Sequence, residues 1–163
     1  SREAVDVVLR YGRGDWFGMR ADQFLTEDIF PVCSPDLLKG KNPLKEPHDL
    51  KRHTLLHDDY FEDWTRWCLA AGVTDIDTDR GPVYEDSANL LQAAIAGEGV
   101  ALGRSALAAD DLAAGRLVRV FDISLPREFA YYVVAPEASA DRPKVAAFRD
   151  WVIETAANDK RRS

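Results

Sequence analysis

The hydrophobic and polar positions of the chain switch repeatedly between a strand period and a helix period. Short apolar runs rich in β-branched and aromatic residues predict strands, and apolar residues spaced three and four apart predict helices between them. The expected strands cover residues 4–12, 24–33, 54–57, 81–85, 100–103, 117–121 and 129–135, and the expected helices begin near residues 35, 47, 63, 87, 105 and 143. Because the two kinds of element alternate with short loops, the pattern predicts an α/β fold with largely parallel sheets.

Individual elements carry more detail. The strand 4–12 reads as buried on both faces, and Pro31 indicates an edge strand or a crossing between layers. A helix from Asp63 is favoured by one apolar face ending at Gly72, which contains Trp64, Trp67, Cys68 and Ala71. The final helix, 143–157, is expected to turn inward Val145, Phe148, Trp151, Val152 and Thr155. Ser105 is predicted to cap the helix that follows it.

Charge and hydropathy narrow the class of protein. The formal net charge of −7 argues against a broad nucleic-acid interface, which needs Lys and Arg, and the terminal cluster 160–162 reads as a solvated end. No apolar run approaches the roughly 18 residues of a membrane span, and the first residues do not form a signal peptide. We expect a cytoplasmic location and no membrane partner. Because the chain lacks an initiator Met and starts almost directly in a strand, we expect a fragment.

Metal binding and disulfide formation are both disfavoured. Cys33 and Cys68 are far apart and follow no CxxC spacing, so we expect two free, partly buried thiols. His48, His53 and His57 lie close together in sequence, but a strand around residues 54–57 breaks the helical spacing that would bring His53 and His57 to one metal ion. We expect no metal and no cofactor.

The stretch EDSANLLQAAIAGEGVALGR, residues 85–104, joins a helix, a glycine cluster and a strand. A dinucleotide fingerprint needs its glycines before the helix, whereas Gly97 and Gly99 follow one, so they are interpreted as a cap and a turn. The start of the same helix is the better candidate for binding, because Asp86 and Ser87 follow a strand and leave free N–H groups. Ligand binding and plain capping both stay open there.

Catalytic arrangements are poor. The chain has no G-x-S-x-G elbow, and HDDYFED, residues 57–63, is interpreted as an acidic solvated loop. Arg10 ends a strand beside Tyr11 and Gly12, where its guanidinium group could pair with a carboxylate ligand. A salt bridge to a neighbouring loop is the alternative for Arg10. We therefore expect a binding domain and no enzyme.

Several segments, in order and spacing, resemble one known family. They are VDVVLRYGRGDWFGM, EDIFPVCSPDLL, GPVYEDSANLLQAAIAGEGVALGRSALAADDLAAGRLVRVF, YYVVAP and AFRDWV. Together they resemble the effector-binding domain of LysR-type transcriptional regulators, in the subgroup typified by the activator of the glycine-cleavage system. The resemblance covers residues 4 to about 156.

The resemblance implies a two-lobed fold like that of type 2 periplasmic binding proteins, with a ligand cleft between the lobes. Lobe I would comprise residues 1–33 and 129–163, and lobe II residues 34–128. Relative to the family, lobe I would be incomplete, because its first strand and helix are missing. The family also implies a homodimer or higher homo-oligomer of the full-length protein, with DNA contacted only through an N-terminal helix-turn-helix that these residues do not contain.

The resulting hypothesis is a sensor of a small effector. The effector-binding residues are predicted to be Arg10, Tyr11, Gly12, His57, Asp86, Ser87 and Arg104. Donors outnumber acceptors in this set, which favours a small carboxylate or amino-acid-like ligand, and Asp86 would accept an ammonium group. A solute-binding protein of a transport system and a small α/β hydrolase or isomerase are the alternatives.

Overall fold

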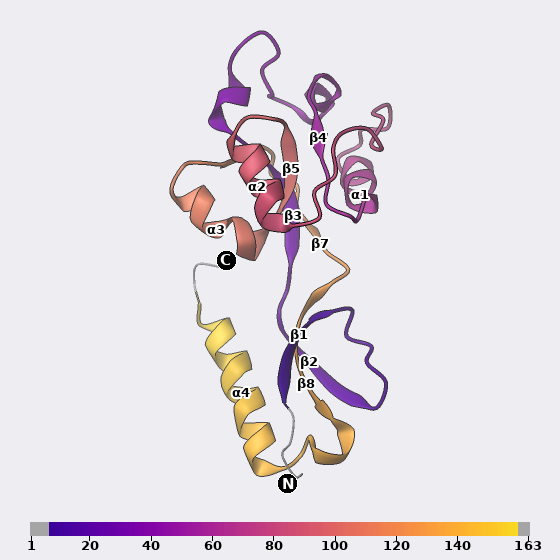
Figure 1. Cartoon of the computed structure of the whole chain (residues 1–163), viewed down its shortest axis with the longest axis vertical. Coiled ribbons are helices and arrows are strands. Elements are labelled where there is room, and N and C mark those ends of the chain that lie inside the picture. The colour runs from indigo at the N-terminus through magenta and orange to yellow at the C-terminus, as the bar shows by residue number, and fades with distance from the viewer. Residues whose placement is uncertain (1–6, 160–163) are drawn as a thin grey trace. The chain divides into compact units, whose positions relative to one another are not determined.

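The chain divides into two compact units (Figure 1). The structure, a computed structural model, describes residues 7–159. The first unit comprises residues 1–27 and 126–163, and the second comprises residues 28–125. Sequence analysis placed residues 28–33 in the first lobe. The structure assigns residues 28–33 to the second unit because they form strand β3 (Asp28–Cys33), which pairs with β5 and β6 there. Residues 126–128, expected in lobe II, belong to the first unit.

The first unit is a three-stranded antiparallel sheet with one long helix. Strand β8 lies between β1 and β2, so β1 and β2 each pair with β8 and not with each other. The helix α4 packs against β2 and β8. The elements of this unit are β1 (Val8–Gly12), β2 (Met19–Leu25), β8 (Ala130–Pro136), the 3-10 helix η3 (Glu137–Ser139) and α4 (Pro143–Ala157).

The first strand is shorter and more exposed than predicted. β1 begins at Val8, and residues 4–6 of the predicted strand lie outside the described residues, as does the basic cluster 160–162. Within the described residues β1 is an edge strand with a partner on one side. Val8 and Leu9 are 43% and 53% exposed, so the prediction of burial on both faces is wrong.

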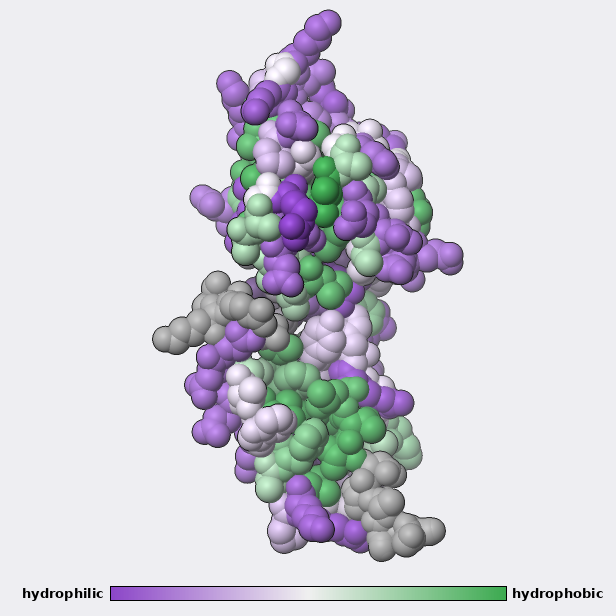
Figure 2. Space-filling view, turned by 60° about the vertical axis from the view of Figure 1, so that its left-hand side comes forward, coloured by the Kyte–Doolittle hydropathy of each residue, from purple (hydrophilic) through white to green (hydrophobic). Residues whose placement is uncertain are grey.

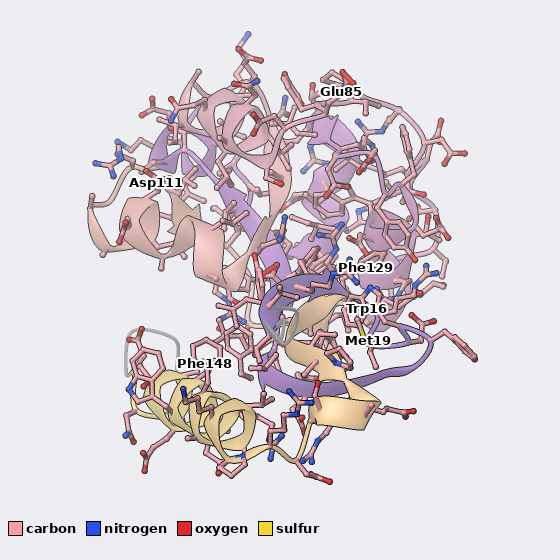
Figure 3. All side chains as sticks on the ribbon, turned by 60° about the horizontal axis from the view of Figure 1, so that its bottom comes forward. Trp16, Met19, Glu85, Asp111, Phe129 and Phe148 are labelled. Atoms are coloured by element: carbon pink, nitrogen blue, oxygen red, sulfur yellow. The ribbon has the colours of Figure 1, made fainter. Side chains whose placement is uncertain are left out.

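Helix α4 has the predicted bounds but buries a narrower face. Val145 and Val152 are buried, and their spacing of two turns forms one stripe against the sheet. Phe148 (labelled in Figure 3) and Trp151 are 37% and 61% exposed, and Thr155 is exposed too, so they are not turned inward as predicted. Figure 2 shows apolar surface gathered on this unit.

The second unit is a mixed sheet covered on both faces. The strand order is β4-β5-β3-β6, and β7 also pairs with β3. Besides β3, its strands are β4 (Leu55–Leu56), β5 (Val100–Arg104), β6 (Val118–Arg119) and β7 (Leu125–Pro126), the last of which reaches into the first unit. Its helices are η1 (Pro35–Leu38), η2 (Pro47–Arg52), α1 (Glu62–Ala70), α2 (Ser87–Ile95) and α3 (Ser105–Ala113).

Strand alternation divides the core of this unit into two halves. Ile29 packs in one half with Trp64 and Trp67 of α1, and its neighbour Phe30 packs in the other half with Leu90 of α2. In Figure 1, α1 lies on one side of the sheet, and α2 and α3 lie on the other. Because both faces of the sheet are covered, the sequences of β3 and β5 are nearly continuous apolar runs.

Several predictions about the strands are wrong. The predicted strand 24–33 is two strands, β2 and β3, and the predicted strand 81–85 is reduced to a single bridge between His57 and Val83. The sheets are mainly antiparallel: β1–β8, β2–β8, β3–β5 and β3–β6 are antiparallel pairs, whereas β4–β5 is parallel. Pro31 lies in the interior strand β3, where its carbonyl oxygen accepts a hydrogen bond of 3.2 Å from Val120 N and only its N–H donor is missing.

Candidate ligand-binding site

The start of α2 and the end of β5 meet in the second unit. Arg104, the last residue of β5, donates a hydrogen bond from Nη1 to Oγ of Ser87, the first residue of α2, over 3.1 Å. Asp86 is the N-cap of α2, and its Oδ1 accepts a hydrogen bond of 2.7 Å from the backbone N–H of Ala88. The structure therefore brings Arg104 and Ser87 together and uses the Asp86 carboxylate for capping.

Arg104 also ends one element and begins the next. It is the N-cap of α3, so Ser105 is the first helical residue and not the predicted cap. The Ser105 hydroxyl instead accepts a hydrogen bond from the backbone N–H of Asp28, the first residue of β3. These contacts fix the end of β5, and with it the Cα position of Arg104, against β3 and α3.

His57 is held from several sides although it lies just beyond a two-residue strand. The side chain is 2% exposed, and its ring stacks on Phe61 with centroids 4.3 Å apart. The ring nitrogen Nε2 lies 2.8 Å from the backbone oxygen of Arg80. The backbone of His57 also donates to Pro82 O and accepts from Tyr84 N, at 3.0 and 2.8 Å. Its orientation is therefore set by the segment 80–84.

A pocket of the second unit is lined by both His57 and Arg104. Its empty volume is ≈ 270 Å³, which includes open solvent at the mouth. Its polar lining is His57, Asp58, Tyr60, Asp63 and Arg104, and its apolar lining is Ile29, Leu56, Trp64, Leu90 and Leu102. A lining that combines a few polar groups with apolar side chains is typical of small-molecule sites.

Sequence analysis missed three of these polar residues. Asp58, Tyr60 and Asp63 belong to the segment that was interpreted as a solvated acidic loop, yet Asp63 is 5% exposed. One signal was available: Asp63 lies four residues before Trp67 and so shares the buried face of α1. Asp63 forms an ion pair with Arg66 at 3.2 Å, and the Asp58 carboxylate accepts a hydrogen bond from Tyr60 N.

The predicted residues of the first unit do not form one cluster. Arg10 and Tyr11 lie on opposite faces of β1, as strand alternation requires. The Arg10 guanidinium lies 5.4 Å from the centre of the Trp16 ring, whereas the Tyr11 hydroxyl accepts a hydrogen bond of 2.8 Å from Nη1 of Arg127. Among residues 7–159, the guanidinium of Arg10 therefore contacts the Trp16 ring, and not the carboxylate of a neighbouring loop that the salt-bridge alternative required.

Gly12 has a packing role in the same unit. A Cβ atom on Gly12 would lie 2.6 Å from Cζ2 of Trp16, so only glycine lets the loop after β1 fold back over the sheet. Trp16 (labelled in Figure 3) also packs edge-on against Tyr132, with ring centroids 5.5 Å apart. Gly12 therefore has a packing role against Trp16 in the first unit.

Metal binding gains no support within residues 7–159. That part of the chain holds no group of three or more His, Cys, Asp or Glu residues that could share an ion. The three histidines have separate partners: His48 contacts Asp75, His53 contacts the backbone oxygen of Asn42, and His57 contacts Arg80.

Both cysteines are free and more fully buried than predicted. Cys33 and Cys68 are 0% and 3% exposed. Burial raises the pKa of each thiol to about 11, because a thiolate is poorly solvated in the core. In residues 7–159 no helix has the length and apolar character needed to span a membrane.

Comparison with known sequences identifies a family. The sequence profile of the LysR substrate binding domain matches residues 1–157. The chain is 44% identical over 156 residues to the glycine cleavage system transcriptional activator of Escherichia coli (strain K12), which covers 96% of this chain and 51% of that protein. It is 32% identical to the homologous activator of Haemophilus influenzae over 96% of this chain and 52% of that protein. The chain spans about half the length of these curated relatives.

Solved structures agree with the sequence comparison. The effector domain of the transcriptional regulator AmpR of Pseudomonas aeruginosa superposes with a TM-score of 0.80 at 31% identity, covering 98% of this chain and 75% of that one. The AmpR effector binding domain of Citrobacter freundii gives a TM-score of 0.78 at 24% identity, covering 95% and 76%. The predicted two-lobed fold, like that of type 2 periplasmic binding proteins, is therefore confirmed.

Proposed function

The chain belongs to the LysR substrate binding domain family, and from this premise we propose that it senses a small carboxylate or amino-acid-like effector for a transcriptional regulator. The observation that carries the proposal is the pocket that is lined by both a guanidinium group, Arg104, and the carboxylates of Asp58 and Asp63. A zwitterion offers one charge to each partner. Effector binding there would shift the domain between conformations, with no catalysis required.

Two features of the second unit favour this class of ligand. Arg104 offers planar donors that match a carboxylate, and its bond to Ser87 holds it next to the N-terminus of α2. The apolar part of the lining, which includes Trp64 and Leu90, lowers the local dielectric constant and so strengthens charge pairing in the pocket. Arg10, Tyr11 and Gly12 of the first unit remain proposed contacts.

The wider role follows from the relatives. Their names describe transcriptional activators, and this chain spans about half of their length. We propose that the full-length protein acts in the cytoplasm as a homodimer or higher homo-oligomer. DNA would be contacted through a helix-turn-helix outside these residues. The formal net charge of −7 agrees with a domain that does not itself grip DNA.

A ligand screen tests the proposal. Thermal-shift measurements on this chain with the proteinogenic amino acids and small carboxylates should reveal a stabilising compound, since a ligand at 100 times its Kd adds about 2.7 kcal/mol to the free energy of unfolding. Calorimetric titration of that compound should then lose at least about tenfold in affinity in Arg104→Ala, the cost of one charge-assisted bond. Arg10→Ala and Ser87→Ala test the other proposed contacts.

The matched control is Arg116→Ala. Arg116 is an exposed arginine of the second unit that pairs with Asp111 at 2.7 Å, and it does not line the pocket. Its removal should leave ligand affinity within about twofold, because an exposed ion pair contributes little. Equal affinities of wild type, Arg104→Ala and Arg116→Ala would refute the site assignment, and the absence of any stabilising compound would count against the proposed class of effector.

A further inference from the structure

We propose that His57 determines specificity in the pocket by accepting a hydrogen bond at Nδ1 from the effector, which must therefore carry a hydrogen-bond donor such as an ammonium group. This inference rests on the proposed function. It also goes further, since it separates amino-acid-like ligands from plain carboxylates and assigns the donor to a particular contact.

The backbone oxygen of Arg80 determines which nitrogen of the His57 ring carries the hydrogen. A carbonyl oxygen can only accept a hydrogen bond, so the contact of 2.8 Å requires that Nε2 of His57 carries the hydrogen. In the neutral imidazole the lone pair is then on Nδ1. The ring atom left to bond a ligand is consequently an acceptor.

Further hydrogen bonds hold Arg80 in the position from which it contacts His57. The Arg80 guanidinium donates to the backbone oxygens of His53 and Leu50, so its side chain is anchored on the end of η2. Pro82, two residues on, accepts the backbone N–H of His57 at 3.0 Å. With Phe61 stacked on the ring, His57 has little freedom to flip and exchange its two nitrogens.

The surroundings of His57 in the pocket carry charges of both signs. Asp58 and Asp63 contribute two negative charges to the lining, and Arg104 contributes one positive charge. Arg66 pairs with Asp63 at 3.2 Å, so two positive charges stand against the two negative ones. A zwitterion fits this mixed lining, with its amino group at Nδ1 of His57, whereas a plain carboxylate gives His57 no donor.

Nitrogen NMR tests the tautomer without any ligand. In a ¹⁵N-histidine-labelled sample of the whole chain, the spectrum of His57, assigned by its loss in His57→Gln, should show a protonated Nε2 and an unprotonated Nδ1. A hydrogen on Nδ1, in either the other tautomer or the doubly protonated ring, would overturn the inference and leave the proposed function standing.

Ligand pairs then test the donor requirement. Each amino acid is titrated beside its des-amino carboxylate, for example alanine beside propionate, with the Nδ1 resonance of His57 as the readout. We expect the best amino acid to move this resonance and to bind at least about tenfold more tightly than its partner. Equal binding of both partners refutes the inference but retains a carboxylate sensor, and no binding by any pair refutes both proposals.

Two substitutions separate the ring nitrogens. His57→Gln places an amide N–H near Nε2 and keeps the bond to Arg80 while removing the acceptor at Nδ1. His57→Asn places an amide group near Nδ1 and removes the bond to Arg80. We expect His57→Gln to retain the wild-type Tm within a few degrees and to lose the preference for amino acids. His57→Asn should instead lower the Tm, because it removes the bond to Arg80. A preference that survives in a folded His57→Gln protein contradicts the assigned role.

Discussion

Gly81 lies so close to Leu55 that a Cβ atom on Gly81 would overlap the backbone oxygen of Leu55. Its φ of +106° also lies in the region that favours glycine. This close approach lets the segment 80–82 run beside β4 and reach His57 with two carbonyl groups. The position of the His57 ring thus depends on Gly81, which has no side chain and does not line the pocket.

Gly81→Ala should therefore destabilise the protein strongly. Overlap with backbone and a disfavoured φ act together, and we expect a loss of more than about 2 kcal/mol in the free energy of unfolding. Chemical denaturation monitored by tryptophan fluorescence measures it. The control is Gly72→Ala, where φ is +77° but nothing lies within 4 Å of the added Cβ, so a loss of about 1 kcal/mol is expected. Equal losses in the two variants would exclude the clash with Leu55 as the cause.

The buried thiols should react slowly in the folded protein. The pKa of about 11 for Cys33 and Cys68 is two units above the ordinary value of 9.0, which lowers the thiolate fraction at pH 8 about a hundredfold, before access is considered. Because folding raises these pKa values, their contribution to stability is complete below pH 9 and is lost as pH rises toward 11. Colorimetric thiol titration at pH 8 should show two slow groups that become fast in denaturant. A rapidly reacting thiol in the native protein is the contrary result.

The order of elements could be predicted from local signals, but the pairing of strands could not. The spacing of Trp64, Trp67 and Cys68 indicated α1 with its buried face, because periodicity is a local property. The insertion of β8 between β1 and β2 depends on contacts more than a hundred residues apart, which no window reports. The prediction of largely parallel sheets failed for this reason.

The candidate site was predicted in part, for similar reasons. His57 and Arg104 were identified because they follow apolar strands, and both line the pocket. Asp58 and Tyr60 were missed because burial of a polar loop is decided by the elements packed around it. The role of Gly12 was also missed, because the return of Trp16 over the sheet leaves no local pattern.

Tyr11→Phe should show what the Arg127 contact contributes. The hydroxyl of Tyr11 accepts a hydrogen bond of 2.8 Å from Nη1 of Arg127, and losing a bond to a charged donor costs about 1.5 kcal/mol. Denaturant titration measures the change. Tyr132→Phe is the matched control, because the hydroxyl of Tyr132 makes only longer, exposed bonds of 3.3 and 3.4 Å to Arg13 and Gln23. It should cost less than about 0.5 kcal/mol, and the reverse order would mean that the Tyr11 hydroxyl is not the important acceptor.

Asp86→Ala and Ser87→Ala should separate capping from ligand binding at the start of α2. Asp86 accepts the Ala88 N–H, so its loss removes a cap and should lower the free energy of unfolding by about 1 kcal/mol. Ser87 makes its side-chain bond to Arg104, so Ser87→Ala should cost less stability, about 0.5 kcal/mol. It should also weaken effector binding several-fold, because the guanidinium is then less firmly held. Parallel denaturation and calorimetric titrations of the two variants measure both effects. If Asp86→Ala weakens effector binding and Ser87→Ala does not, the carboxylate of Asp86 is a direct ligand contact. The roles assigned to the two residues, capping for Asp86 and support of binding for Ser87, would then be wrong.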